Sequence, residues 1–285
     1  MPNSAGPTDP SILLVDNGSL APAATLNLRE IAGKLAQATG KIITPVSLLH
    51  SSAIPEAELG GQPAEIIEPA IEQRLRKGCN NFLIVPLFFG PSNALTDYLP
   101  RRLAALKEKR IPFVVRLAPP LVDLNQTTDS RIAQILEGHV RAKLADSGPQ
   151  TAVVLVDHGS PVREVAAVRD FLAMQLQQRL GDTVRTVRAA SMERRPGAHY
   201  AFSDPLLDHL LDQPDFNSGP IIIAMLFLSP GRHAGPNGDV MQIVSAAQKR
   251  HPAMQPLMTD LVGNHSGLIP ILIDRLLTGM ESNPL

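Results

Sequence analysis

The stretch TAVVLVDHGS at residues 151–160 is an apolar run that ends in a short polar turn containing glycine. This pattern predicts a buried strand followed by a tight turn. A second copy, ILLVDNGS, begins at residue 12, about 140 residues earlier. Farther along each half, AMLFLSPGRHAG (224–235) is matched by VPLFFGPSNAL (85–95). The chain therefore contains an internal duplication, and the two copies keep the same order of motifs.

Each half alternates short apolar runs with amphipathic stretches of helical period, which predicts βαβ units around a parallel sheet. Strands are expected at 11–16, 42–48, 82–88 and 112–117, and again at 151–157, 184–190, 220–228 and 254–259. Helices are expected at 28–40, 64–78, 93–109 and 128–145, and again at 162–181, 239–250 and 267–281. Pro69 should kink its helix or delay the start of that helix.

The predicted fold class is α/β, with two tandem domains at 1–147 and 148–285 related by pseudo-two-fold symmetry. Each domain should hold a four-stranded, mainly parallel sheet flanked by helices. The polar segment ADSGPQ (145–150) is the expected boundary. Because the duplication already supplies two copies of the unit, the chain can form this pseudo-dimer as a monomer.

Composition narrows the class of protein. The 285 residues are 44% hydrophobic and 19% charged, with a net charge of −1 and no basic run, which argues against a nucleic-acid partner. The only cysteine, Cys79, excludes an intramolecular disulfide and is expected to be buried. The first dozen residues do not read as a signal peptide, and no apolar run approaches the roughly 20 residues of a membrane span. The expected location is the cytoplasm.

Two histidines indicate that the C-terminal half carries the functional site. His158 directly follows one predicted strand and His233 follows another, whereas the first copy has Asn17 and Ala94 at these positions. Parallel α/β sheets build their sites beyond the carboxyl ends of the strands, so both imidazoles should face one crevice, which we expect between the halves. Neutral imidazole binds divalent metals and can accept protons near neutral pH. A lone histidine is usually structural, but a pair at matching strand ends favours a shared site.

The string Asp157-His158-Gly159-Ser160 does not predict a hydrolase triad. Adjacent residues at a strand end point to different sides, and the chain has no G-x-S-x-G motif. Asp157 is more simply a turn residue and Ser160 a helix N-cap. The long polar segment 191–205, which follows a strand and carries arginines, should instead line the site.

The motifs VVLVDHGS and MLFLSPGRHAG together resemble those of the class II chelatases of the CbiX/SirB type, which insert Co²⁺ or Fe²⁺ into sirohydrochlorin. The resemblance covers most of the chain, since the first half resembles a second, degenerate copy. It implies that His158 and His233 bind the metal and assist removal of the pyrrole protons. It also implies a carboxylate after the second strand, for which Glu193 is the best candidate.

A sirohydrochlorin-like tetrapyrrole carries several carboxylates, which arginines bind well. Candidate ligand-binding residues are Arg232, Arg194, Arg195 and Ser160, and His50 and His199 are supplementary candidates. The metal, as Co²⁺, Fe²⁺ or Ni²⁺, is a substrate of the implied reaction. No nucleotide is expected, because the chain has no GxxxxGK[ST] loop.

Three classes of function remain open on the sequence. The favoured one is an ATP-independent, metal-inserting lyase in cobalamin or siroheme biosynthesis. The second is a non-catalytic metal or tetrapyrrole carrier on the same fold, and the third is an enzyme with a different substrate. The fold alone does not separate them.

Overall fold

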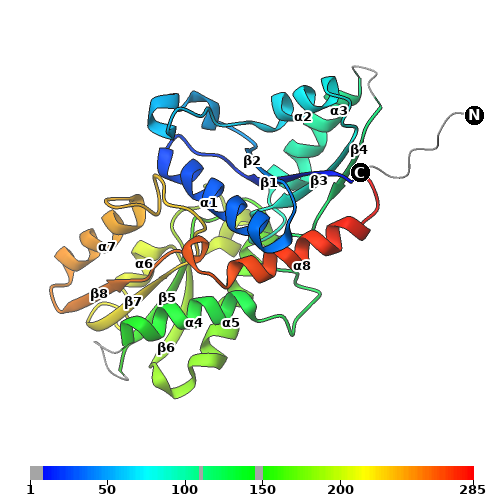
Figure 1. The fold of residues 1–285 in the computed structure, drawn as a ribbon. Helices are drawn as coiled ribbons and strands as arrows, with labels where there is room; N and C mark the ends of the chain where they lie inside the picture. Colours follow the sequence, from blue (N-terminus) through cyan, green and yellow to red (C-terminus); the bar gives the residue numbers. More distant parts are fainter. Residues whose placement is uncertain (1–8, 109–111, 145–149) are drawn as a thin grey trace, which may run out of the picture. The chain divides into compact units, whose positions relative to one another are not determined.

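The computed structural model describes residues 9–108, 112–144 and 150–285 (Figure 1). The chain divides into two compact units. Unit one comprises Met1–Phe88, Asn93–Leu121 and Ile269–Leu285, and unit two comprises Phe89–Ser92 and Val122–Leu268. Residues 145–149 of the predicted boundary segment lie outside the described residues.

Unit one is built on a parallel sheet with strand order β2-β1-β3-β4. Its strands are β1 (Ser11–Asp16), β2 (Ile43–Ser47), β3 (Asn81–Pro86) and β4 (Val114–Leu117). Its helices are α1 (Pro22–Thr39), α2 (Ile67–Arg76), α3 (Leu99–Lys107) and α8 (Leu268–Glu281). Helices α2 and α3 cover one face of the sheet, and α1 and α8 cover the other (Figure 1).

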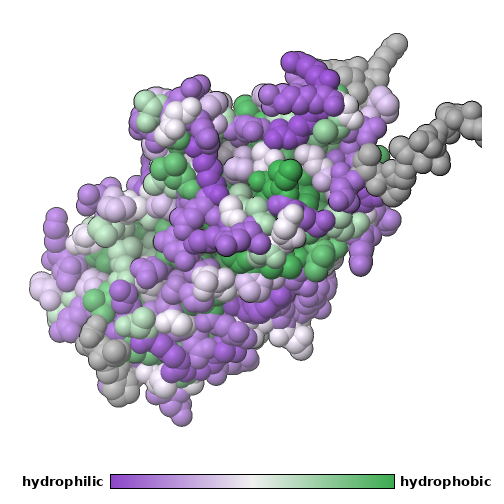
Figure 2. Space-filling model, viewed as in Figure 1, coloured by the Kyte–Doolittle hydropathy of each residue, from purple (hydrophilic) through white to green (hydrophobic). Residues whose placement is uncertain are grey.

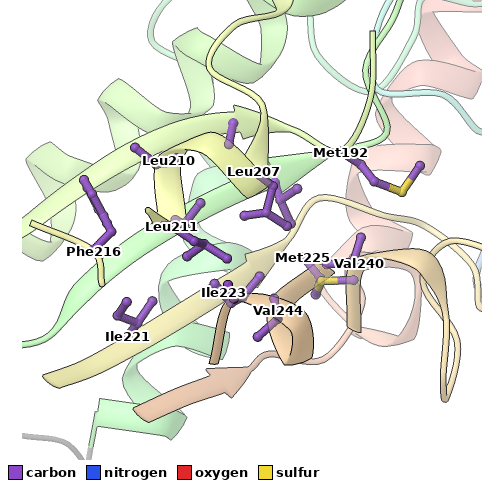
Figure 3. Close-up of a cluster of buried hydrophobic side chains, with 14 of the residues drawn as sticks. Met192, Leu207, Leu210, Leu211, Phe216, Ile221, Ile223, Met225, Val240 and Val244 are labelled. Carbon is purple, nitrogen blue, oxygen red and sulfur yellow. The ribbon is translucent and has the colours of Figure 1, made fainter. Parts of the chain in front are cut away.

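Unit two repeats this plan with the strand order β6-β5-β7-β8, again parallel throughout. Its strands are β5 (Ala152–Asp157), β6 (Thr186–Ser191), β7 (Gly219–Met225) and β8 (Met254–Met258). Its helices are α4 (Arg131–Leu144), α5 (Arg163–Leu180), α6 (Leu207–Leu211) and α7 (Asp239–Arg250). Figure 3 shows one face of the β7 strand, where Ile221, Ile223 and Met225 pack with side chains of α6 and α7. Every residue of β5 is buried, as expected of a central strand covered on both sides.

The predicted α/β class, with two four-stranded parallel sheets flanked by helices, is confirmed, and the pseudo-two-fold relation stays a prediction. Helices α1, α2 and α6 differ from the prediction, each for a reason in the nearby sequence. Helix α1 begins at Pro22, ahead of the predicted residue 28, because proline is well tolerated in the first helical turn. Pro69 delays α2 rather than kinking it and stands in the first turn. The short helix α6 was not predicted, because five residues are too few to show a period.

The compact units differ from the sequence halves in their last helix. Helix α4 follows the first repeat along the chain but packs against α5 and β7 of unit two. Helix α8 follows the second repeat but belongs to unit one, where the fully buried Arg275 donates to the carbonyls of Pro120 (2.9 Å) and Leu121 (3.0 Å). The halves 1–147 and 148–285 thus describe the sequence repeat, and the helices are exchanged between the units.

Hydrophilic residues cover most of the face drawn in Figure 2, with smaller apolar areas between them. Cys79, expected to be buried, is exposed, because it lies in the turn between α2 and β3. Among the described helices, none combines the length and the apolar character that a membrane span requires.

Candidate active site

The carboxyl ends of three adjacent strands of unit two bring the predicted site residues together. Strand β5 lies between β6 and β7, so the turns that follow these strands meet at one edge of the sheet. His158 follows β5, Glu193 follows β6, and His233 lies in the loop after β7. The rings of His158 and His233 are 4.5 Å apart between centroids and tilted by 49°. The predicted convergence of the two imidazoles is therefore present within unit two.

His158 and Glu193 are spaced as two ligands of one ion would be. The distance between His158 Nε2 and Glu193 Oε1 is 3.3 Å. Two ligand atoms, each about 2 Å from a metal in tetrahedral geometry, are separated by about this distance. His158 Nδ1 lies 3.0 Å from the carbonyl of Gly159, to which it donates in the Nδ1–H tautomer. In that tautomer Nε2 carries the lone pair. This nitrogen faces Glu193 and can bind a metal ion or a proton.

His233 is oriented by a carboxylate that sequence reasoning missed. Its Nδ1 lies 2.6 Å from Oδ2 of Asp239, the first residue of α7. A carboxylate bonded to one ring nitrogen fixes the tautomer and makes the other nitrogen a better ligand or base. The available signal was an acidic residue in the first turn of the helix that follows the histidine loop.

The turn that carries His158 depends on a glycine and on a buried carboxylate. Gly159 has φ +92°, and a Cβ at this position would lie 1.9 Å from the carbonyl oxygen of Glu193. Its N–H donates to Oδ1 of Asp157 at 3.1 Å. Burial raises the pKa of Asp157, and the guanidinium of Arg169, 3.9 Å away, partly offsets that effect. The predicted turn role of Asp157 fits these contacts.

The candidate site consists of two pairs of neighbouring side chains that share His158. Within the described ranges of the chain, no group of three or more His, Cys, Asp and Glu side chains is arranged to hold a metal ion. His158 has Glu193 as one neighbour and His233 as the other. The side chains of His158 and Glu193 are 47% and 63% exposed, so both can reach an incoming ligand.

The predicted arginines fall into different environments. Arg232 is well exposed, with its Nε 3.5 Å from Asp239 Oδ2. Arg194 instead makes an ion pair with Asp204 at 2.8 Å and donates to loop carbonyls, so its charge holds the segment after β6 together. Arg195 is exposed, 6.0 Å from the ring of Tyr200.

The remaining candidates have simpler surroundings. Ser160 is not the N-cap of α5, because Val162 occupies that position. The Ser160 hydroxyl accepts a hydrogen bond from the Val162 N–H at 3.1 Å. The ring of His199 contacts that of Tyr200, with 4.0 Å between centroids and a tilt of 45°. His50 belongs to unit one and is exposed there.

Unit one preserves the backbone of this site without its side chains. The N–H groups of Leu48 and Leu49 donate to the carbonyls of Asp16 and Asn17, as those of Met192 and Glu193 donate to Asp157 and His158. The positions of the two histidines and the glutamate are thus held by Asn17, Ala94 and Leu49. Sequence comparison of the repeats revealed the first two replacements, and the structure adds the loss of the carboxylate at Leu49.

A cavity of about 500 Å³ lies at the amino edge of the sheet of unit one. It is lined by residues before or at the amino ends of β1 and β3, including Ser11, Cys79 and Asn81, and by the turn at Lys41. In a parallel α/β sheet, sites form at the opposite, carboxyl edge. We therefore assign this cavity no role in the candidate site.

The substitution Gly159→Ala should destabilise the protein by about 3 kcal/mol and also weaken Co²⁺ binding, because the added Cβ would displace the Glu193 backbone. Gly18→Ala is the matched control, since its Cβ would lie 1.8 Å from the carbonyl oxygen of Leu49. Both variants should unfold at lower urea concentration. Only Gly159→Ala should bind Co²⁺ more weakly per folded molecule, and equal Co²⁺ affinity in the two variants would contradict the assignment.

The substitution Asp239→Asn should weaken Co²⁺ binding by about 10- to 100-fold while leaving the fold intact, because His233 loses its orienting carboxylate. The matched control is Asp212→Asn, which removes a similar contact between His251 Nε2 and a carboxylate at 2.8 Å, away from the site. Isothermal titration with Co²⁺ measures both. Equal affinities for Co²⁺ in the two variants would show that Asp239 does not support the metal site.

Comparison with known proteins gives a consistent result for the fold. Residues 152–278 match the family model described as CbiX. No curated protein matches the chain. The solved structure of SirB from Bacillus subtilis with Fe³⁺ is 14% identical, with 95% of this chain and 96% of that chain covered and a TM-score of 0.71.

Two further solved structures have the same fold. The sirohydrochlorin chelatase SirB from Bacillus subtilis subspecies spizizenii, in complex with cobalt, is 14% identical over 96% of this chain and 97% of that chain, with a TM-score of 0.69. CbiX, described as the terminal enzyme for biosynthesis of siroheme in denitrifying bacteria, is 17% identical over 94% and 98%, with a TM-score of 0.58. These likenesses cover 94% to 96% of this chain and so include most of its first half.

Proposed function

We propose that this chain, in which residues 152–278 match the CbiX family on a fold shared with SirB, inserts a divalent metal ion into a sirohydrochlorin-like tetrapyrrole. The observation that carries the proposal is that His158 has two neighbours at one edge of the sheet, the His233 ring on one hand and the Glu193 carboxylate on the other. Two imidazoles and a carboxylate supply both functions that the reaction needs, a ligand set for the metal and acceptors for protons.

The chemistry balances without a further reactant. A metal-free tetrapyrrole loses two N–H protons as the M²⁺ ion enters the ring, so the charge of the departing protons equals that of the ion. His158 Nε2 and Glu193 first hold the ion, which is a substrate here. As the ion moves to the ring nitrogens, these groups and His233 Nε2 become free to accept the pyrrole protons. Asp239 keeps the imidazole of His233 in the tautomer that this step requires.

Imidazole and carboxylate ligands suit several mid-series ions, so we propose Co²⁺, Fe²⁺ or Ni²⁺ as the metal. The solved relatives hold Fe³⁺ in one case and cobalt in another, which supports this choice. The product of such a reaction would enter siroheme or cobalamin synthesis. We infer that the degenerate unit one supports the active unit and supplies no second metal site.

The test is an anaerobic incubation of the protein with sirohydrochlorin and either Co²⁺ or Fe²⁺, followed by the change in the absorption spectrum. We expect insertion to be faster than in the protein-free control and to need no nucleotide. Binding of the metal or of the tetrapyrrole without faster insertion would instead identify a carrier. Failure to bind either component would contradict both functions.

A further inference from the structure

An exposed cluster of rings and arginines lies beside the candidate site, on the segment that follows β6 and at the start of α5. We define the ring–arginine cluster as Arg163, Arg195, His199, Tyr200 and Phe202. We propose that this cluster is the docking surface for the tetrapyrrole, with the rings against the macrocycle and the two arginines on its carboxylates. The inference rests on the proposed function and names the surface by which the substrate would be recognised.

The rings of the cluster contact one another in a row: the His199 and Tyr200 planes are tilted by 45°, and the Tyr200 and Phe202 planes meet edge-on at 69°. The centroids of His199 and Tyr200 are 4.0 Å apart, and those of Tyr200 and Phe202 are 6.2 Å apart. Aromatic residues are scarce in this chain, which has two tyrosines, eight phenylalanines and no tryptophan. Exposed or half-buried rings gathered on one segment offer apolar ring faces and edges for contact with a planar ligand.

The two arginines carry charge that the protein does not neutralise locally. The Arg163 guanidinium lies 4.8 Å from the Phe202 centroid, and that of Arg195 lies 6.0 Å from the Tyr200 centroid. Among the described residues, neither arginine makes an ion pair with a carboxylate, and the nearby Asp204 is already paired with Arg194. Stacked guanidinium groups keep their N–H donors directed outward, where they can bind carboxylates in pairs.

The segment is bonded to the His158 turn at both of its ends. At the start, the Glu193 N–H donates to the carbonyl of His158 at 3.2 Å. At the end, the Ser203 hydroxyl donates to the carbonyl of Ser160 at 3.1 Å. The cluster is therefore held next to the metal-binding residues.

A buried arginine donates hydrogen bonds to the backbone of the segment that carries the rings. Arg169 is 1% exposed and donates to the carbonyls of Phe202 (3.2 Å) and Ser203 (3.1 Å). A surface that is ordered before the ligand arrives loses less conformational entropy on binding. The backbone that carries the Phe202 ring is thus held in place before a ligand binds.

The corresponding segment of unit one has lost these features together with the histidines. Between His50 and Ile66 the chain has no Phe, Tyr, Lys or Arg, and it carries Glu56, Glu58 and Glu65. This segment offers no positive side chain of its own to a ligand that bears carboxylates: Glu56 and Glu58 are exposed, and Glu65 is paired with Arg74. The arginines and the rings therefore accompany the half that kept its metal-binding residues, which is expected if they serve the same substrate.

The experiment compares the wild-type protein with Arg163→Ala/Arg195→Ala, using metal-free uroporphyrin as an anionic probe and a tetracationic N-methylpyridyl porphyrin as its charge-reversed control. We expect the double variant to bind uroporphyrin about tenfold or more weakly, with no loss of affinity for the cationic ring and no change in Co²⁺ affinity. The matched control, Arg76→Ala/Arg101→Ala, removes the same charge from exposed positions of unit one. Equal uroporphyrin affinity in both double variants would overturn the proposal.

Tyrosine fluorescence gives a second readout, because the chain contains only Tyr98 and Tyr200 and no tryptophan. In a Tyr98→Phe background, bound uroporphyrin should quench the remaining emission from Tyr200. Unquenched emission at saturating uroporphyrin would place the ligand elsewhere and overturn the proposal.

These measurements separate the two hypotheses. If the wild-type protein inserts no metal, the proposed function fails, and the uroporphyrin affinities still decide the role of the cluster. If insertion proceeds and the cluster variant keeps the KM of the wild type for the tetrapyrrole, the docking surface is wrong and the proposed function stands. A raised KM with unchanged kcat supports both.

Discussion

Replacing His158 or His233 with alanine should lower the rate of metal insertion by about 10²- to 10⁴-fold, the range typical of losing a group that transfers protons in the transition state. The two rings lie together at an exposed strand edge and contribute little to packing, so both variants should stay folded. The rate is measured from the absorption change of sirohydrochlorin with Co²⁺, and the fold from far-ultraviolet circular dichroism.

The matched control for this experiment is His209→Ala, which removes an exposed imidazole from α6 of the same unit. We expect this variant to insert metal at the wild-type rate. Wild-type rates in both His158→Ala and His233→Ala would refute the assignment of the site. A loss in only one of them would reduce the site to one imidazole and its carboxylate partner.

The substitution Asp16→Asn should stabilise unit one at neutral pH. Burial raises the pKa of Asp16 from 3.8 to about 6, and hydrogen bonds from Ser47 and Gly18 only partly oppose this. One carboxylate oxygen of Asp16 is buried without a hydrogen-bond partner. The equivalent Asp157 has Arg169 beside it, whereas the corresponding position of α1 holds Leu28, which is buried and uncharged.

The stability of the wild type depends on pH because the pKa of Asp16 differs between the folded and unfolded states. The folded state binds the proton of Asp16 more tightly than the unfolded state, so the wild type loses stability as the pH rises from about 4 to about 6. Above both pKa values the penalty is complete and amounts to about 3 kcal/mol. Asparagine carries no charge at any of these pH values and escapes the penalty.

Urea unfolding at several pH values between about 4 and 8 measures this effect. We expect the gain in the free energy of unfolding to be largest above pH 7 and to vanish towards pH 4. The control is Asp97→Asn, which changes an exposed carboxylate of the same unit and should show no such gain. A constant difference between Asp16→Asn and wild type across this range would contradict the raised pKa of Asp16.

The fold was largely predictable from the sequence because the central strands β1, β3, β5 and β7 are short apolar runs and the glycine turn after β1 is repeated after β5. The convergence of His158 and His233 was predictable for the same reason, since parallel strands end at one edge. Asp239 was not predictable, because its contact with His233 depends on how the loop after β7 folds back to the start of α7. Nor could the sequence distinguish Arg194, held in an ion pair with Asp204, from the exposed Arg195.

The exchange of α4 and α8 between the units has a consequence for how the chain can be divided. A chain cut near residue 147 would separate each sheet from the helix that covers it, so neither fragment should fold alone. The two fragments mixed together contain every element and should reassemble by mutual complementation. Unit one as a single piece requires joining Ile269–Leu285 to the segments that precede Val122, which calls for a rearranged chain order. The ancestral duplication thus left two modules that are similar in plan and obligatory partners in folding.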